Sequence, residues 1–303
     1  MGYLRAVMAA EEHSPRVLSL TEHIISLNAA HYTVWLYRAT TLFALHSSIH
    51  NELTWINGVA LENQKNYQIW HHRQLLLDHL YPTLSADPAA LQQLAVSEIA
   101  FMTQMFGEDA KNYHVWGYRQ YLVRKLNLFN EAELKSIEEL LRLDVRNNSA
   151  WSHRFFIVFS NPEYATPGSK STERDPGIPD SVIEREITFA QAATFEAPQN
   201  QSPWNYIRGV LRKGGRKLST LEGFASEFVK LPKEADEVVE GEQEDVKSSH
   251  ALDFLADCWA EMGDEKRAGI ALVLLAEKYD PIRRNYWEWR RQLLVGEGKA
   301  IAA

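Results

Sequence analysis

The chain has 303 residues, of which 45% are hydrophobic and 24% charged, and this composition excludes a mini-protein, a collagen-like chain and a largely disordered chain. Its 32 Lys and Arg residues are outnumbered by 40 Asp and Glu residues, which gives a net charge of −8. That sign argues against nonspecific coating of nucleic acid or anionic lipid, so any anion site must be local. The single cysteine, Cys258, excludes an internal disulfide and a multi-cysteine zinc site. With no long apolar run and no signal-like N-terminus, we expect a cytoplasmic protein without a membrane span.

A motif of the form Asn-x-x-x-Trp-x-x-Arg recurs along the chain. Its copies are HYTVWLYR (31–38), NYQIWHHR (66–73), NYHVWGYR (112–119), NNSAWSHR (147–154) and NQSPWNYIR (200–208). The first copy has His31 in place of Asn, the fifth places Arg208 one residue later, and a degenerate sixth copy follows at Trp287. Two separations between successive tryptophans are 35 residues, in the range of two-helix solenoid repeats.

The segments between the motifs have helical periodicity. Residues 131–143 and 264–279 each place apolar side chains on one helical face. We find no strand alternation and no Asn-Gly hairpin signal, so we expect no strands. Each repeat is therefore predicted to be a helical hairpin whose second helix carries the motif.

The motif has a physical explanation at the start of a helix. Asn66, Asn112, Asn147 and Asn200 are predicted N-caps, and the Trp four residues later should lie on the buried face. The Arg three residues after the Trp shares that face and can reach a carboxylate of a neighbouring helix. We expect Arg73, Arg119 and Arg154 to link adjacent hairpins in this way. Candidate partners stand just before several caps: Glu62, Glu108, Asp109 and Asp144.

Two segments interrupt the repeats. Residues 161–180 are rich in Pro, Gly, Ser and charge, and residues 231–249 form an acidic run. Both are predicted to be surface insertions. We expect residues 1–303 to form one all-α domain, an α-α superhelix that curves as a right-handed crescent of hairpins.

Catalytic motifs are largely absent from the sequence. We find no Gly-rich phosphate loop, no Gly-x-Ser-x-Gly and no His-Glu-x-x-His, and we interpret His71 and His72 as polar groove or surface residues. One cluster is more specific, because Lys111 precedes the cap Asn112 and Tyr113 and His114 follow it, so a cation and a helix N-terminus could converge on an anion. The alternative is a solvated surface lysine. Lys65 and Arg146 occupy the equivalent positions before their caps and extend a positive rim.

The repeat segments resemble those of a known family. LNAAHYTVWLYR (27–38), KNYQIWHHR (65–73), DAKNYHVWGYR (109–119), DVRNNSAWSHR (144–154) and DPIRRNYWEWR (280–290) look like the repeats of protein prenyltransferase α subunits. The similarity is strongest to the α subunit shared by protein farnesyltransferase and geranylgeranyltransferase type I. The resemblance implies an α chain that wraps an obligate β subunit, with zinc and most of the isoprenoid pocket in β. Because relatives usually carry an N-terminal extension, Met1 and Gly2 are expected to mark a shortened N-terminus.

The resemblance also implies a reaction and a set of site residues. The family transfers a farnesyl or geranylgeranyl group from its diphosphate to the cysteine thiol of C-terminal CaaX proteins such as small GTPases, with magnesium accompanying the diphosphate. Lys111 matches the lysine that meets the diphosphate, and Tyr113 lies near the reacting carbon. His114, where relatives often have Gln, matches a residue that meets the peptide carboxylate. Tyr67 is expected to line the peptide channel. Arg119 is a further substrate-binding candidate, and the expected structural supports are Asn112, Asn147, Trp116, Trp151 and Arg154.

Two alternatives remain open at this point. One is the α subunit of Rab geranylgeranyltransferase, and the other is a tetratricopeptide-like adaptor that binds peptides without a catalytic role. The Trp-x-x-Arg frame argues against the adaptor. No nucleic acid is expected among the partners.

Overall fold

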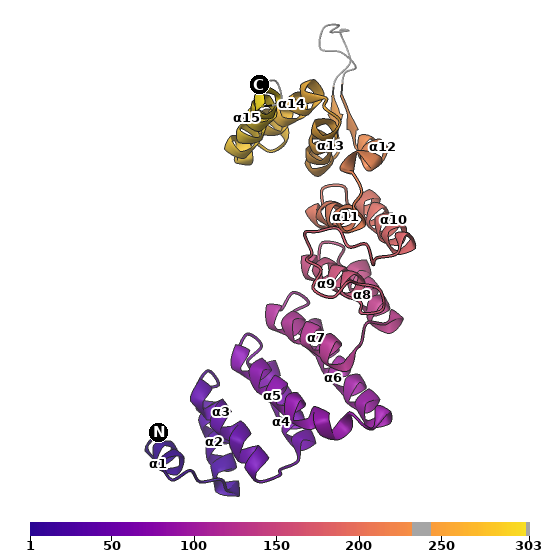
Figure 1. Ribbon diagram of the computed structural model, residues 1–303. Coiled ribbons are helices and arrows are strands. Elements are labelled where there is room, and N and C mark those ends of the chain that lie inside the picture. Colours follow the sequence, from indigo (N-terminus) through magenta and orange to yellow (C-terminus); the bar gives the residue numbers. More distant parts are fainter. Residues whose placement is uncertain (232–243, 301–303) are drawn as a thin grey trace. The chain divides into compact units, whose positions relative to one another are not determined.

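The protein folds into α-helices joined mostly by short turns (Figure 1). This computed structural model describes residues 1–231 and 244–300, with side chains described as far as residue 294. Internal packing divides the chain into two compact units, Met1–Asn130 and Glu131–Ala303. Each unit is a stack of helical hairpins, as the periodicity indicated. A single continuous solenoid over the whole chain stays a prediction.

The first unit contains one short helix and three hairpins. Its helices are α1 (Gly2–Ala9), α2 (Pro15–Leu27), α3 (Tyr32–Ala44), α4 (Ile49–Glu62), α5 (Tyr67–Leu84), α6 (Pro88–Glu108) and α7 (Tyr113–Leu126). The second helices of successive hairpins pack in a row, α3 against α5 and α5 against α7. Their N-termini, where the motif begins, are therefore neighbours.

The second unit begins with two helical hairpins of the same kind and continues with shorter elements, a two-stranded sheet and three further helices. Its elements are α8 (Glu131–Leu143), α9 (Asn148–Phe159), α10 (Asp180–Glu196), α11 (Gln201–Gly214), α12 (Glu222–Ser226), β1 (Val229–Lys230), β2 (Asp245–Val246), α13 (Ser249–Glu261), α14 (Glu265–Leu274) and α15 (Arg284–Ala300). A 3-10 turn (Leu218–Leu221) precedes α12, while a π-helical turn (Leu275–Tyr279) and a second 3-10 turn (Pro281–Arg283) lead into α15. No helix in the described part of the chain is long and apolar enough to cross a membrane.

The predicted N-caps are confirmed. The Oδ1 atoms of Asn66, Asn112, Asn147 and Asn200 accept hydrogen bonds from the backbone N–H groups two residues later. His31, which stands in the same place, makes no side-chain cap bond. Each cap satisfies at least one of the orphan N–H groups of a helix start, so the motif fixes where α5, α7, α9 and α11 begin.

Single carbonyl oxygens tie neighbouring hairpins together. The indole of Trp35 donates to Ala29 O at 2.7 Å, and Asn66 Nδ2 of the next hairpin donates to the same oxygen at 2.6 Å. Val145 O likewise accepts from Trp151 and Asn200 within the second unit. The caps therefore also set the spacing between hairpins, and the expectation that the motif tryptophans are buried is confirmed.

Buried carboxylates hold the arginines of the motif. Arg73 Nε and Nη2 donate to Glu98 Oε2 and Oε1, both at 2.7 Å, and Tyr118 Oη donates to Glu98 Oε2 at 2.6 Å. Arg38 pairs with Glu52 and Arg154 with Glu186 in the same manner. Each Glu lies on the first helix of the following hairpin, so each pair joins two hairpins.

The prediction that arginines link hairpins is confirmed for Arg73 and Arg154, but the predicted partners are wrong. Arg73 pairs with Glu98 inside α6 rather than with Glu62 or Glu108. The reason is geometric: the arginine follows its cap by seven residues and lies about two turns into the helix. Its guanidinium therefore meets the middle of the neighbouring helix, not the turn.

The side chain that contacts the buried glutamate alternates along the chain between histidine and tyrosine: it is His72, Tyr118, His153 and Tyr206 in turn. His72 Nε2 lies 2.9 Å from Glu52 Oε1, and His72 is fully buried, whereas its neighbour His71 is exposed. The interpretation of His72 as a surface residue is therefore wrong. Burial lowers the pKa of His72 below its ordinary value of 6.5 although the Glu52 carboxylate opposes this. The side chain is therefore neutral at physiological pH, with its Nε2–H donating to Glu52.

The pH dependence of stability should reveal this buried histidine. Because the unfolded chain has an unperturbed His72, it binds more protons than the folded chain once the pH falls below about 6.5. The contribution of His72 to the free energy of unfolding is then complete above that pH and is lost as the pH falls. Urea unfolding across this range should show a shallower pH dependence for His72→Tyr, which installs the tyrosine of the equivalent positions. His71→Tyr is the control, and a wild-type slope in His72→Tyr would exclude His72 as the titrating group.

The segment between α9 and α10 is a loop anchored at one residue. Asp175 is buried and accepts hydrogen bonds from Thr166 Oγ1 at 2.6 Å and from the backbone N–H of Gly177 at 3.0 Å. Burial opposes ionisation of Asp175, but these hydrogen bonds outweigh it and lower its pKa to about 2. The Nζ of the buried Lys213 lies 3.5 Å from Asp175 Oδ2. The loop is thus fixed against α11.

The expectation that no strand occurs is wrong at one place. Strands β1 and β2 pair antiparallel, with Val229 opposite Val246 and Lys230 opposite Asp245. Two residues per strand are too few to give an alternation pattern in the sequence. The strands flank the predicted acidic insertion 231–249, of which residues 232–243 lie outside the described residues.

Candidate functional site

The N-termini of α5 and α7 form one edge of the first unit. Asn112 Nδ2 donates to Gln64 O at 2.9 Å, which ties the turn before α7 to the turn before α5. Its Oδ1 atom caps α7 through the N–H of His114 at 3.0 Å. One buried asparagine therefore positions both turns, and the two helix N-termini present partial positive charge on the same edge.

The structure brings four of the predicted site residues to this edge. Tyr67 and Tyr113 are the first residues of α5 and α7, and their exposed fractions are 62% and 81%. Lys111 is exposed, and His114 is partly exposed with its ring against that of Tyr113 at 5.7 Å. The edge thus offers a lysine, two phenols and an imidazole to a ligand.

A second lysine and a carboxylate complete the edge. Lys65 Nζ lies 3.4 Å from Asp109 Oδ2, and Asp109 Oδ1 accepts the backbone N–H of Lys111 at 3.0 Å. One aspartate therefore contacts the ammonium group of Lys65 and the backbone of Lys111. The only sequence signal for this carboxylate is its position three residues before a cap, which Asp144 shares.

A hollow of about 620 Å³ opens beside Lys65. It is lined by the turn before α3 and the turn before α5, residues 27–30 and 63–67. Lys65 and Tyr67 belong to this lining, so the hollow and the lysine edge are continuous in the first unit. The motif pattern did not indicate the hollow, because most of its lining residues lie in the turns before the motif copies.

The predicted supporting residues are buried. Arg119, which was predicted to bind substrate, is buried as well: its exposed fraction is 3%, and it lies against the rings of Phe106 and Trp116, both at 5.5 Å. In the second unit, Asn147 caps α9 and Trp151 donates to Val145 O. Arg154 lies over the ring of Phe189 in addition to its bond to Glu186. Each of these side chains packs within its own unit.

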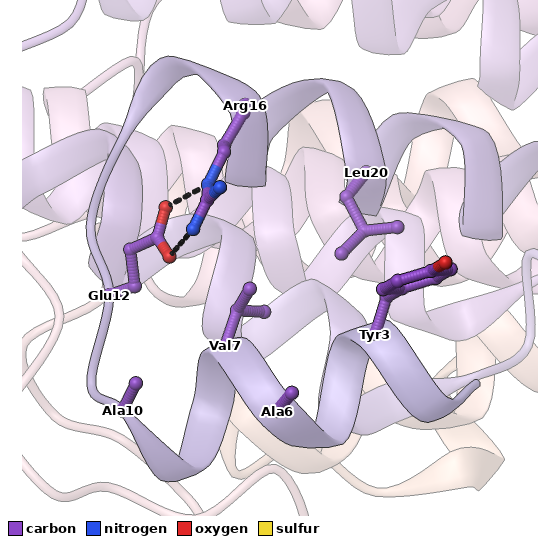
Figure 2. A pocket seen from close by; sticks show the side chains of 7 residues that line it. All are labelled: Tyr3, Ala6, Val7, Ala10, Glu12, Arg16 and Leu20. Carbon is purple, nitrogen blue, oxygen red and sulfur yellow. Dashed lines mark hydrogen bonds and ion pairs between the residues drawn. The ribbon is translucent and has the colours of Figure 1, made fainter.

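A further hollow of about 400 Å³ lies between α1 and α2 (Figure 2). Glu12 and Arg16 face each other at one end and Tyr3 and Leu20 lie at the other. The bond from Arg16 lowers the pKa of Glu12 to about 2. None of the predicted site residues lines this hollow.

Metal and thiol chemistry have no site in the described residues. Among the described side chains, which end at residue 294, no group of three or more His, Cys, Asp and Glu could hold a metal ion. Cys258 is buried, and burial raises the pKa of its thiol to about 12. A neutral buried thiol is a poor nucleophile, so Cys258 is a packing residue.

Comparison with known proteins identifies the repeats. The family described as protein prenyltransferase alpha subunit repeat matches residues 49–80, 96–126, 130–161 and 183–214. The protein farnesyltransferase/geranylgeranyltransferase type-1 subunit alpha of Candida albicans is 37% identical over 96% of this chain and 86% of its own length. The subunit of the same name from Dictyostelium discoideum is 32% identical over 99% of this chain and 85% of its own length.

A solved structure agrees with the sequence relatives. It is the Candida albicans protein geranylgeranyltransferase-I complexed with GGPP, with a TM-score of 0.83 and 36% identity, over 97% of this chain and 89% of the matched chain. The chain therefore belongs to the protein prenyltransferase α-subunit family. Within it, the chain is of the type shared by farnesyltransferase and geranylgeranyltransferase type I, which confirms the resemblance of the repeats.

The two alternatives are weaker than this assignment. The geranylgeranyl transferase type-2 subunit alpha of mouse is 27% identical over only 67% of this chain. The family match also removes the basis for a tetratricopeptide-like adaptor. The protein is thus a subunit of a heterodimeric prenyltransferase.

Proposed function

We propose that this chain pairs with a β subunit to transfer a farnesyl or geranylgeranyl group from its diphosphate to the cysteine thiol of CaaX proteins such as small GTPases. The observation that carries the proposal is the edge formed by Lys65, Lys111, Tyr67 and Tyr113 at two helix N-termini. Cations and helix N-termini favour anions such as diphosphate. The relatives named for this activity support the assignment.

The lysines act on the leaving group in this proposal. As the bond between the isoprenoid carbon and the diphosphate oxygen breaks, negative charge accumulates on the leaving diphosphate. A fixed ammonium near those oxygens therefore stabilises the transition state more than the ground state. Lys111 is the predicted cation, and we add Lys65 because Asp109 contacts both the Lys65 ammonium and the Lys111 backbone, and because Lys65 lines the hollow.

The other exposed residues bind substrate in this proposal. Tyr113 lies beside the diphosphate and the reacting carbon, and Tyr67 lines the peptide channel. His114 donates a hydrogen bond to the C-terminal carboxylate of the peptide. We assign Arg119 a supporting role because it is buried against Phe106 and Trp116.

The cofactors belong to the complex rather than to this chain. The described residues contain no cluster that could bind a metal, so we assign zinc to the β subunit, where it would supply the activated thiolate. Magnesium would accompany the diphosphate and, together with the lysines, neutralise its negative charge. We place the complex in the cytoplasm, in keeping with the unpaired buried cysteine.

Exposed apolar side chains support the need for a partner. The first residues of α3, α5 and α7 are exposed tyrosines, and near the C-terminus Ile282, Tyr286 and Trp289 are exposed. Apolar side chains exposed in groups mark interaction surfaces. We therefore expect the chain alone to be poorly soluble and to be stabilised by β.

Co-expression with a farnesyltransferase-type β subunit tests the proposal. We expect a stable complex in which zinc-dependent transfer to a CaaX peptide requires both chains, and the preferred diphosphate identifies the enzyme formed. Omitting magnesium from the assay shows whether it is needed. A stable monomer that does not bind β and supports no transfer would contradict the proposal.

A further inference from the structure

Asp109 combines two interactions at the lysine edge. It follows the last residue of α6, and its Oδ1 atom accepts the backbone N–H of Lys111 at 3.0 Å. Its Oδ2 atom lies 3.4 Å from the Nζ atom of Lys65. One carboxylate therefore contacts the turn that carries one lysine and the ammonium of the other.

The first interaction does not need a negative charge. Asn28, at the equivalent position before α3, makes the same turn, with its Oδ1 atom accepting the N–H of Ala30 at 3.0 Å. An amide oxygen thus suffices for the turn geometry. What the carboxylate of Asp109 adds is the charge that faces Lys65.

The ion pair between Asp109 and Lys65 is weak enough for a diphosphate to displace the carboxylate. The Lys65 side chain is 80% exposed and that of Asp109 is 29% exposed. Exposed ion pairs contribute only about 0.2–1 kcal/mol, whereas a diphosphate carries several negative charges. A diphosphate that arrives at this edge can therefore take the ammonium from the carboxylate.

We propose that Asp109 is a positioning residue for the diphosphate site, which holds the Lys65 ammonium at the edge until diphosphate displaces it. This inference rests on the proposed function, since it requires the prenyl diphosphate to bind at the edge. Asp109 then competes with diphosphate for Lys65. The negative charge of Asp109 therefore lowers the affinity of the site for the substrate diphosphate and speeds the release of the product diphosphate.

The test compares variants of the complete heterodimer. Asp109→Asn keeps the turn, as Asn28 shows, and removes the charge. We expect it to lower the KM for the isoprenoid diphosphate and the Kd for inorganic diphosphate roughly two- to fivefold, with kcat unchanged or lower. In a Lys65→Ala background, the same substitution should change neither constant.

Asp87→Asn is the matched control. Asp87 caps α6 through the N–H groups of Ala89 and Ala90, so this variant also removes one negative charge from the first unit while an oxygen remains to cap the helix. We expect it to leave both constants unchanged. A purely structural role of Asp109 would not produce a change in KM that depends on Lys65.

The outcomes are distinguishable. An unchanged Kd for inorganic diphosphate in Asp109→Asn, or an equal change with and without Lys65, would overturn the inference while prenyl transfer by the unaltered heterodimer upholds the proposed function. No transfer by the unaltered heterodimer would contradict the proposed function itself, and the inference would fall with it.

Discussion

Replacing Lys111 by alanine is expected to lower the turnover of the heterodimer roughly tenfold to a thousandfold, the scale for loss of one charge contact in a transition state. The side chain is exposed at the start of α7, so its removal leaves no cavity in the core. Assembly with β and the melting temperature should therefore be unchanged. The loss should appear in single-turnover rates, because it concerns the departing diphosphate.

Lys65→Ala should lower turnover on the same scale. Lys65 occupies the equivalent position one hairpin earlier, and Asp109 contacts both its ammonium group and the backbone of Lys111. If both ammonium groups meet the diphosphate, the effects of the two substitutions should be non-additive in the double variant, because the sites share a partner. Comparison of the two single variants shows how much each lysine contributes to stabilising the charge on the leaving diphosphate.

Lys125→Ala is the control for both lysine variants. Lys125 lies at the other end of α7, about 20 Å from Lys111 along the helix axis, where it pairs with Asp78. Its removal changes the net charge by the same amount and should leave turnover intact. Wild-type turnover in Lys111→Ala or Lys65→Ala would remove that lysine from the site.

The repeat frame could be predicted because its determinants are local. A cap residue such as Asn112 acts on backbone groups two residues away, and Trp116 follows within one turn. Helix starts and buried faces therefore follow from short sequence spacing. The family could be identified for the same reason, since the motif copies carry its signature.

The partners across hairpins could not be predicted in this way. Glu98 is 25 residues from Arg73, and nothing in the spacing between motifs says which face of α6 meets α5. One regularity was available: each such Glu precedes by 20 residues the Tyr or His that shares it, as Glu98 precedes Tyr118 and Glu52 precedes His72. The role of Asp109 was equally hidden, because it depends on two turns that the chain brings together from 44 residues apart.

Replacing Glu98 by alanine is expected to destabilise the protein by about 3–5 kcal/mol, because it leaves a buried guanidinium without its partner. Arg73 and Glu98 are both 1% exposed. Burial alone would lower the pKa of Arg73, but the Glu98 carboxylate outweighs this effect and raises it, so the guanidinium stays charged. In Glu98→Ala, Arg73 keeps the hydrogen bond from its Nη1 atom to Asn57 Oδ1 but has lost its carboxylate partner.

The exposed pair of Asp78 and Lys125 provides the comparison. Asp78→Ala removes a carboxylate that also binds two donors, Lys125 and Tyr121, but in a half-exposed position. Water replaces the lost contacts, so the expected cost is at most about 1 kcal/mol. Urea unfolding followed by tryptophan fluorescence measures both variants under the same conditions.

A triple variant separates the cost of an unpaired charge from the value of the ion pair. Arg73→Met, Glu98→Leu and Tyr118→Phe together replace the buried network by apolar side chains of similar size, which can be neutral or stabilising. We expect the triple variant to be more stable than Glu98→Ala. If Glu98→Ala lay within about 1 kcal/mol of the wild type, the network would not hold α5, α6 and α7 together. If instead the triple variant were as unstable as Glu98→Ala, the ion pair itself would stabilise the hairpin stack, and the instability of Glu98→Ala would not come only from the unpaired charge of Arg73.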